Sequence, residues 1–212
     1  MAPLDEQIRA AAVAAVALIE PGMRVGLGTG RTVAQLLPTL AERRIERLRC
    51  VATSPETQQA ATALGIPVEP FDRLDRLDIA IDGADQVTPD RWAVKGGHGA
   101  HLREKIVARA ADRFVVIVTP DKLVDALHPP VPLELVEFGL AATLHALRVA
   151  QLREGAPPTP DGGVLADYQG AIEDPAELVS LLDQMPGVVE HGLFGPQLVD
   201  DVIVGREAEQ SR

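Results

Sequence analysis

The sequence predicts an α/β fold: a Rossmann-like, mostly parallel sheet with helices on both faces, plus a small α+β unit. Two observations support this fold class. From the N-terminus to about residue 130, segments with helical spacing of apolar residues alternate with short apolar runs, which is typical of a parallel sheet. At residues 128–132 the chain reads His-Pro-Pro-Val-Pro, which cannot continue a helix and indicates a boundary.

Local signals place the elements of the first unit. The first helix ends before Pro21-Gly22, and another helix begins at Pro55 and ends before Gly65, as expected for proline and glycine at helix ends. The clearest buried strand is the apolar run 114–118. The predicted helices cover residues 5–19, 32–43, 55–64 and 102–111, and the predicted strands cover residues 24–27, 48–53, 68–70, 77–81 and 114–118.

The second unit is predicted to have a βαββαβ, ferredoxin-like order in which one weak strand is not visible. Its predicted strands cover residues 133–136, 164–167 and 188–193, and its predicted helices cover residues 140–152 and 175–184. We therefore expect a Rossmann-like catalytic domain over residues 1–130, joined again by residues 198–206, and a small α+β domain over residues 131–197. Residues 207–212 are expected to be frayed.

The composition argues against several classes of function. Asp and Glu number 31 against 20 Lys and Arg, a formal net charge of −11, and aromatic residues make up only 3%. We therefore expect no nucleic-acid binding. No apolar run approaches the roughly 18 residues that span a bilayer, so we expect no membrane association and a cytoplasmic location. The single cysteine, Cys50, excludes an internal disulfide and is expected to lie in the core.

A glycine-rich loop, Gly-Leu-Gly-Thr-Gly-Arg-Thr at residues 26–32, follows a predicted strand and opens a predicted helix. This context favours a phosphate group held by main-chain N–H groups at the helix N-terminus. The dinucleotide pattern G-x-G-x-x-G fails, because Arg31 or Val33 occupies its last position, and there is no P-loop lysine. A monophosphate site is therefore favoured, and the alternative is a tight turn that needs small residues.

A second group of residues indicates acid–base chemistry. Asp82 and Asp85 follow a predicted strand, and the run from Lys95 carries Gly96, Gly97 and Gly99 before Glu104 on a predicted helix. The lysine and the glycine N–H groups would stabilise an oxyanion, and the glutamate could move a proton. The alternative is that the aspartates cap a helix and that Glu104 forms surface pairs. We expect no metal site, because no suitable histidine–carboxylate spacing is present.

The motifs together resemble ribose-5-phosphate isomerase of the A type, from about residue 6 to residue 205. The segments that carry the resemblance are GLGTGRT (26–32), DGAD (82–85), KGGHGA (95–100), LREKIV (102–107) and PGVVEHGLF (186–194).

The resemblance implies a cofactor-free enzyme that interconverts D-ribose 5-phosphate and D-ribulose 5-phosphate in the non-oxidative branch of the pentose phosphate pathway. It implies that Glu104 carries a proton between C1 and C2, and that Asp82, Asp85 and Lys95 assist ring opening and stabilise the enediolate. It also implies a homodimer or homotetramer. The residues expected to bind substrate are Gly28, Thr29, Gly30, Arg31, Thr32, Gly96, Gly97, Gly99 and Lys122.

The chain also departs from the family pattern. Arg31 stands where the family usually has serine, and His98 stands in place of a usual glycine. His98 and His101 lie inside the lysine–glycine–glutamate segment, and the sequence leaves their effect on the site open. Two alternatives therefore remain: a divergent isomerase of another sugar phosphate, and a non-catalytic sensor of sugar phosphates on the same fold. A transferase of the related CoA-transferase type is disfavoured, because no loop of the size that binds a nucleotide is present and the chain is short.

Overall fold

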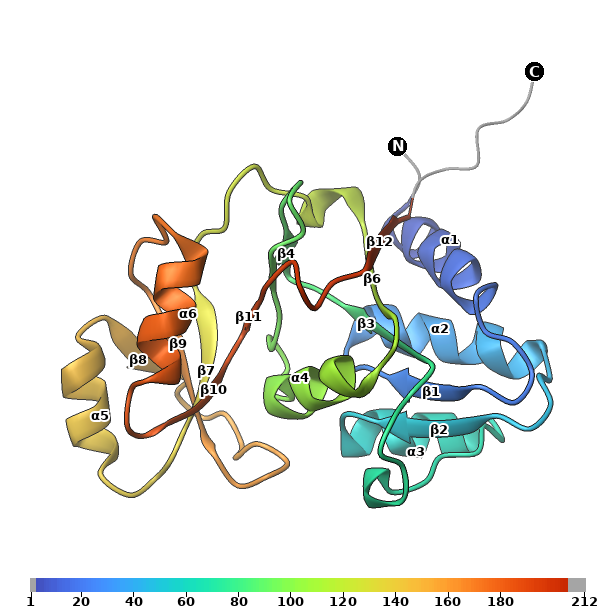
Figure 1. Ribbon diagram of the computed structural model, residues 1–212, viewed down its shortest axis with the longest axis horizontal. Helices are drawn as coiled ribbons and strands as arrows, with labels where there is room; N and C mark the ends of the chain where they lie inside the picture. Colours follow the sequence, from blue (N-terminus) through green and yellow to red (C-terminus); the bar gives the residue numbers. More distant parts are fainter. Residues whose placement is uncertain (1–2, 206–212) are drawn as a thin grey trace.

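A five-stranded parallel sheet organises the first part of the protein in this computed structural model, which describes residues 3–205 (Figure 1). Its strand order is β12-β6-β3-β1-β2, and all pairings are parallel. The strands are β1 (Arg24–Leu27), β2 (Arg49–Ala52), β3 (Ile79–Gly83), β6 (Phe114–Val118) and β12 (Asp201–Val204). The predicted parallel sheet is thus confirmed, and residues 201–204 return to it at one edge.

Helices cover both faces of this sheet, as predicted. Successive side chains of a strand point to opposite faces, so that Ile79 and Ile81 join one core cluster while Ala80 joins the other. The first cluster packs under α1, α2 and α3, and the second packs under α4. These helices are α1 (Leu4–Val16), α2 (Arg31–Glu42), α3 (Pro55–Ala63) and α4 (His101–Ala110). Cys50 is fully buried in the first cluster.

A four-stranded antiparallel sheet, in the order β10-β7-β9-β8, forms the second part. Its elements are β7 (Val131–Leu135), α5 (Leu140–Leu147), β8 (Ala150–Leu152), β9 (Val164–Tyr168), α6 (Pro175–Asp183) and β10 (Val188–His191). This is the full βαββαβ order. In Figure 1, α5 and α6 lie on the outer side, and α4 lies between the two sheets and contacts both.

The predicted helix over residues 140–152 is wrong in its second half. Arg148 has a φ of 58°, which interrupts the helical backbone, and the chain continues as β8. β8 is the strand that was not visible in the sequence. The predicted strand at 68–70 is also wrong, because Val68 forms only an isolated bridge with Cys50.

A third sheet of very short strands was not predicted. It contains β4 (Gln86–Val87), β5 (Ala93–Val94) and β11 (Leu193–Phe194) in the order β11-β5-β4. The predicted strand 188–193 is interrupted at Gly192, which separates β10 from β11. A Cβ at this position would lie 2.2 Å from the Lys95 carbonyl oxygen, so that only glycine fits. β11 belongs to the second predicted unit and β5 to the first, so the two units share this sheet. The division of the chain into domains at residue 130 stays a prediction.

Among residues 3–205, no helix combines the length and the apolar character needed to cross a membrane. The predicted frayed segment 207–212 lies outside the described residues.

Candidate active site

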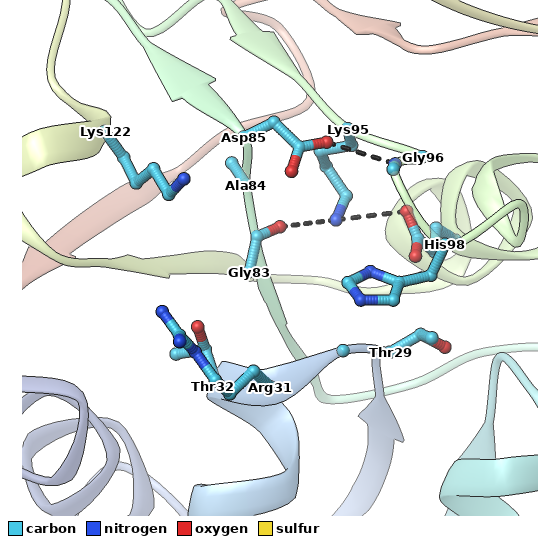
Figure 2. A pocket seen from close by; sticks show the side chains of 13 residues that line it. Thr29, Arg31, Thr32, Gly83, Ala84, Asp85, Lys95, Gly96, His98 and Lys122 are labelled. Carbon is cyan, nitrogen blue, oxygen red and sulfur yellow. Dashed lines mark hydrogen bonds and ion pairs between the residues drawn. The ribbon is translucent and has the colours of Figure 1, made fainter. Parts of the chain in front are cut away.

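The glycine loop and the aspartates meet at the carboxyl ends of β1 and β3, which are neighbours in the parallel sheet. This is where open α/β sheets bind ligands. A cavity of about 340 Å³ opens there (Figure 2). Its lining residues are Thr29, Gly30, Arg31, Thr32, Gly83, Ala84, Asp85, Lys95, Gly96, Gly97, His98, Glu104 and Lys122.

A buried lysine between two carboxylates forms the centre of the site. Lys95 Nζ lies 2.8 Å from Asp82 Oδ2 and 3.2 Å from Glu104 Oε2, and it donates a hydrogen bond of 2.5 Å to the Gly83 carbonyl. All three charged side chains are 2–3% exposed. A lysine and two acids from three separate segments therefore share one nearly water-free space.

Asp82 is fixed by the glycine loop. The main-chain N–H groups of Thr29 and Gly83 donate to Asp82 Oδ1, at 3.0 and 2.7 Å. Gly28 lies against the same carboxyl group, and a Cβ at that position would stand 1.9 Å from Asp82 Cγ. Gly28 is thus placed outside the cavity lining, at a point where no larger residue fits without moving the aspartate.

The pKa values of Glu104 and Lys95 in this cluster are both raised. Burial and the nearby charge of Asp82 raise the pKa of Glu104 to about 8 against the opposing effect of Lys95. Burial alone would lower the pKa of Lys95, but the attraction of Asp82 and Glu104 outweighs it and raises that pKa. One ammonium thus faces two carboxyl groups, and Glu104 is the acid that holds a proton near neutral pH. A carboxyl group of this kind can take up and release a proton at the cavity wall.

Positive groups gather at the end of the cavity that is formed by α2. Arg31 and Thr32 begin this helix, whose N-terminus carries a partial positive charge. Lys122 lies on the short turn after β6, and its Nζ is 3.7 Å from Asp121. In Figure 2, Lys122 and His98 stand at opposite sides of the cavity. A helix N-terminus with two cations suits a phosphate dianion.

A tight turn at residues 96–99 forms another wall. Gly99 N donates to the Gly96 carbonyl at 3.0 Å, and Gly97 N donates to Asp85 Oδ2 at 3.1 Å. Gly96 and Gly99 both have positive φ values, 95° and 76°. Gly96 and Gly97 line the cavity, whereas Gly99 faces Leu165, whose Cδ1 would lie 2.6 Å from an added Cβ.

The two histidines of this segment differ in position. His98 is exposed, and its ring lies against Gly30 across the cavity, 2.9 Å from the place of an added Cβ. His101 is fully buried behind the turn, and burial lowers its pKa to about 3, so that it stays neutral. His98 can therefore contact a ligand, and His101 is a packing residue. Together with Gly83 and Ala84, His98 extends the predicted set of lining residues.

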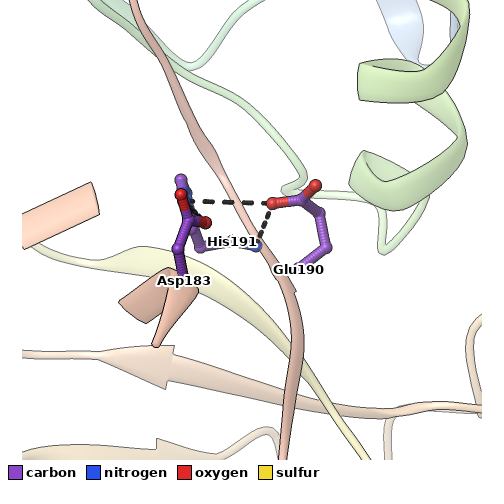
Figure 3. Close-up of side chains that lie close together, drawn as sticks. All are labelled: Asp183, Glu190 and His191. Carbon is purple, nitrogen blue, oxygen red and sulfur yellow. Dashed lines mark hydrogen bonds and ion pairs between the residues drawn. The ribbon is translucent and has the colours of Figure 1, made fainter. Parts of the chain in front are cut away.

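Behind α4 lies a second group of ionisable residues, Asp183, Glu190 and His191 (Figure 3). His191 Nε2 is 3.2 Å from Asp183 Oδ1, and its Nδ1 accepts from Leu193 N at 3.1 Å. Lys105 Nζ lies 2.5 Å from Glu190 Oε1 and 3.3 Å from His191 Nδ1. Lys105 thus pairs with Glu190 and contacts His191 on the side of Nδ1, while Asp183 contacts Nε2, so that ion pairs and hydrogen bonds hold this group together as a packing network.

Phe194 connects this network to the active site. Its ring centroid is 5.4 Å from Lys95 Nζ and 5.1 Å from Lys105 Nζ, so that one aromatic ring contacts both ammonium groups. Spacing in the sequence gave no signal for this contact, because Phe194 lies far along the chain from both lysines.

Known proteins match the chain over nearly its whole length. A family model described as Ribose 5-phosphate isomerase A (phosphoriboisomerase A) matches residues 49–209. Ribose-5-phosphate isomerase A of Nitrobacter hamburgensis is 43% identical in an alignment of 209 positions, which covers 90% of this chain and 90% of that protein.

Solved structures agree with this match. The crystal structure of ribose 5-phosphate isomerase A from Neisseria gonorrhoeae has a TM-score of 0.93 at 33% identity and covers 98% of this chain and 95% of its own. A D-ribose-5-phosphate isomerase in complex with phospho-erythronic acid has a TM-score of 0.91 at 34% identity, with 96% of each chain covered. Because sequence and structure agree over this length, the chain belongs to the ribose-5-phosphate isomerase A family.

Proposed function

We propose that this protein interconverts D-ribose 5-phosphate and D-ribulose 5-phosphate through an enediolate, with Glu104 as the base. The observation that supports this most directly is the buried cluster in which Lys95 contacts both Asp82 and Glu104 at the cavity wall. An aldose–ketose isomerisation needs a carboxylate that can carry a proton and a positive group that stabilises an oxyanion. Both are present within one cavity.

In the proposed reaction, Asp82 and Asp85 assist ring opening by moving the proton of the C1 hydroxyl group to the ring oxygen. Glu104 then takes the proton from C2, and the electron pair of the broken C–H bond forms the C1–C2 double bond of an enediolate. Lys95 stabilises the negative charge on its oxygens. Glu104 returns the proton to C1, and the hydroxyl proton of O2 passes to O1, which leaves the carbonyl group at C2.

The decisive experiment follows ketose formation from ribose 5-phosphate by the purified protein, with EDTA present. We expect steady turnover. No turnover together with tight binding of a pentose phosphate would favour the sensor. Faster turnover of a different sugar phosphate would favour the divergent isomerase.

We expect kcat/KM to rise with pH through about pH 8. Burial raises the pKa of Glu104 to about 8, and the group must be ionised to accept a proton from carbon. Below that pH the carboxyl group is protonated and inactive, and above it the carboxylate is available. The pH profile of kcat/KM checks this expectation, and a profile that falls with rising pH over this range would contradict the role of Glu104 as a base.

Lys122→Met is expected to raise KM for ribose 5-phosphate about 10-fold and to leave kcat nearly unchanged, because it removes uniform binding to the phosphate. Lys122 lines the cavity at the side opposite His98, near Arg31 at the α2 N-terminus. Steady-state kinetics check this, with unphosphorylated ribose as the control substrate whose kcat/KM should not change. An equal loss with ribose would place the phosphate elsewhere.

The proposed assembly is a homodimer or homotetramer in the cytoplasm. Support comes from exposed apolar side chains near the second sheet: Val136, Phe138 and Leu152 are 43%, 92% and 43% exposed. Size-exclusion chromatography with light scattering tests the assembly, and a monomer at all concentrations would contradict it.

A further inference from the structure

Arg153 follows β8 in the second sheet and reaches the glycine turn of the active site. Its Nε and Nη2 atoms donate to Asp167 Oδ2 and Oδ1, at 2.8 and 2.7 Å, so that the guanidinium is held as a fork. Its Nη1 atom donates to the carbonyl oxygens of Gly97 and Gly96, at 2.9 and 3.3 Å. The side chains of both Arg153 and Asp167 are less than 20% exposed.

These contacts set the direction of two peptide groups. In a planar trans peptide the C=O and N–H bonds point in opposite directions. Because the Gly96 carbonyl faces Arg153, the N–H of Gly97 points away from it, and this N–H donates to Asp85 Oδ2. Because the Gly97 carbonyl also faces Arg153, the N–H of His98 must point away from the arginine as well.

The N–H of His98 differs from that of Gly97 in having no hydrogen-bond acceptor among residues 3–205. His98 and both glycines line the cavity that also holds Lys95 and Glu104. An unused main-chain donor at such a wall is suited to an oxyanion, and a positive charge behind the carbonyl oxygens polarises the peptide groups and strengthens the donor.

We infer, on the basis of the function proposed above, that Arg153 is a positioning residue: it orients the Gly96–His98 peptide groups so that the His98 N–H joins Lys95 in binding the enediolate oxygens. Arg153 itself does not line the cavity. Arg153 therefore acts through the glycine turn. By way of this arginine, the second sheet sets the shape of the active site near Lys95.

Arg103 provides a matched control. It also forms a fork with an aspartate, Asp161, at 2.8 Å for both contacts, and it also donates to a carbonyl oxygen, that of Pro160, at 3.2 Å. It ties α4 to the connection before β9 but donates to no carbonyl group of the glycine turn. Loss of Arg103 therefore removes a similar bridge between the two parts of the chain without releasing the turn.

The experiment compares Arg153→Met, Arg153→Lys and Arg103→Met with the wild type. We measure kcat and KM for ribose 5-phosphate, the melting temperature, and Kd values for inorganic phosphate and for 4-phospho-D-erythronate, whose carboxylate resembles an enediolate. For Arg153→Met we expect kcat to fall about 30-fold and the 4-phospho-D-erythronate Kd to rise by a similar factor, since oxyanion donors act mainly in the transition state. The Kd for phosphate should stay unchanged, Arg153→Lys should recover part of the loss, and Arg103→Met should match the wild type.

Equal effects of Arg153→Met and Arg103→Met on kcat, or an unchanged Kd for 4-phospho-D-erythronate in Arg153→Met, would overturn the inference. If Arg153→Met does not fold, Asp167→Asn takes its place, because it loosens the fork and keeps the guanidinium; an unchanged kcat in that variant would likewise overturn it. Absence of turnover in the wild type would instead refute the proposed function, and the binding measurements would still test the orientation of the turn.

Discussion

Glu104→Gln is expected to lower kcat about 1,000-fold and to leave the affinity for ribose 5-phosphate nearly unchanged, because the amide cannot accept a proton from carbon. The substitution keeps the size and the planar shape of a side chain that is 3% exposed and lies against Lys95. It also removes an acid whose pKa is raised to about 8, so the variant should lose the rise of activity near that pH.

Single-turnover kinetics and calorimetric titration with 4-phospho-D-erythronate would separate the chemical step from binding. Glu104→Asp is the companion variant, because it keeps the carboxylate but moves it away from the substrate; we expect an intermediate loss, since a misplacement of about 1 Å can cost about 100-fold. Near-normal turnover by Glu104→Gln would show that another group is the base.

Lys95→Met is expected to abolish measurable turnover and also to lower the free energy of unfolding by about 3–5 kcal/mol, because it leaves a buried charge without its partner. The lysine is 2% exposed and contacts Asp82, Glu104 and the Gly83 carbonyl. The loss should be smaller below about pH 8, where Glu104 is protonated, than above it, where Glu104 is ionised and also needs the lysine as a partner. Denaturant unfolding at two pH values and the isomerase assay check both effects.

The double variant Lys95→Met/Asp82→Asn separates the two roles of the lysine. It removes the ion pair from both sides, so that much of the stability should return while turnover stays absent. Stability that does not recover in the double variant would mean that the hydrogen bond to Gly83, or the contact with Phe194, carries most of the contribution of Lys95.

Much of the site could be predicted from the sequence because its parts are local signals. Glycines after a short apolar run and aspartates at a strand end both place polar groups at the same edge of a parallel sheet. Lys95 and Glu104 are close along the chain, so that one turn and the start of a helix bring them together. Three residues in the predicted set, Gly28, Asp82 and Gly99, are not part of the cavity lining. Gly28 packs against Asp82, and Gly99 packs against Leu165.

The remainder depends on contacts between distant segments. β5 and β11 have two residues each, which is too short for any period of apolar residues to be visible. The helix predicted over 140–152 ends early because Arg148 adopts a left-handed backbone, which is uncommon for a residue with a side chain. Arg153 reads in the sequence as one more surface charge, and only the packing of the second sheet brings it to the glycine turn.

The hydrogen bond of 2.8 Å from Lys95 N to the Gly192 carbonyl has a consequence for the synthesis of the protein. The nascent chain emerges from the ribosome with its N-terminus first. Every side chain of the proposed reaction therefore emerges before β11. Until β11 pairs with β5, the strand that precedes the lysine has only one of its two partner strands, β4. Nascent chains that stop short of Gly192 would therefore contain every side chain of the proposed reaction and yet be inactive, and activity would begin only after β11 has been synthesised.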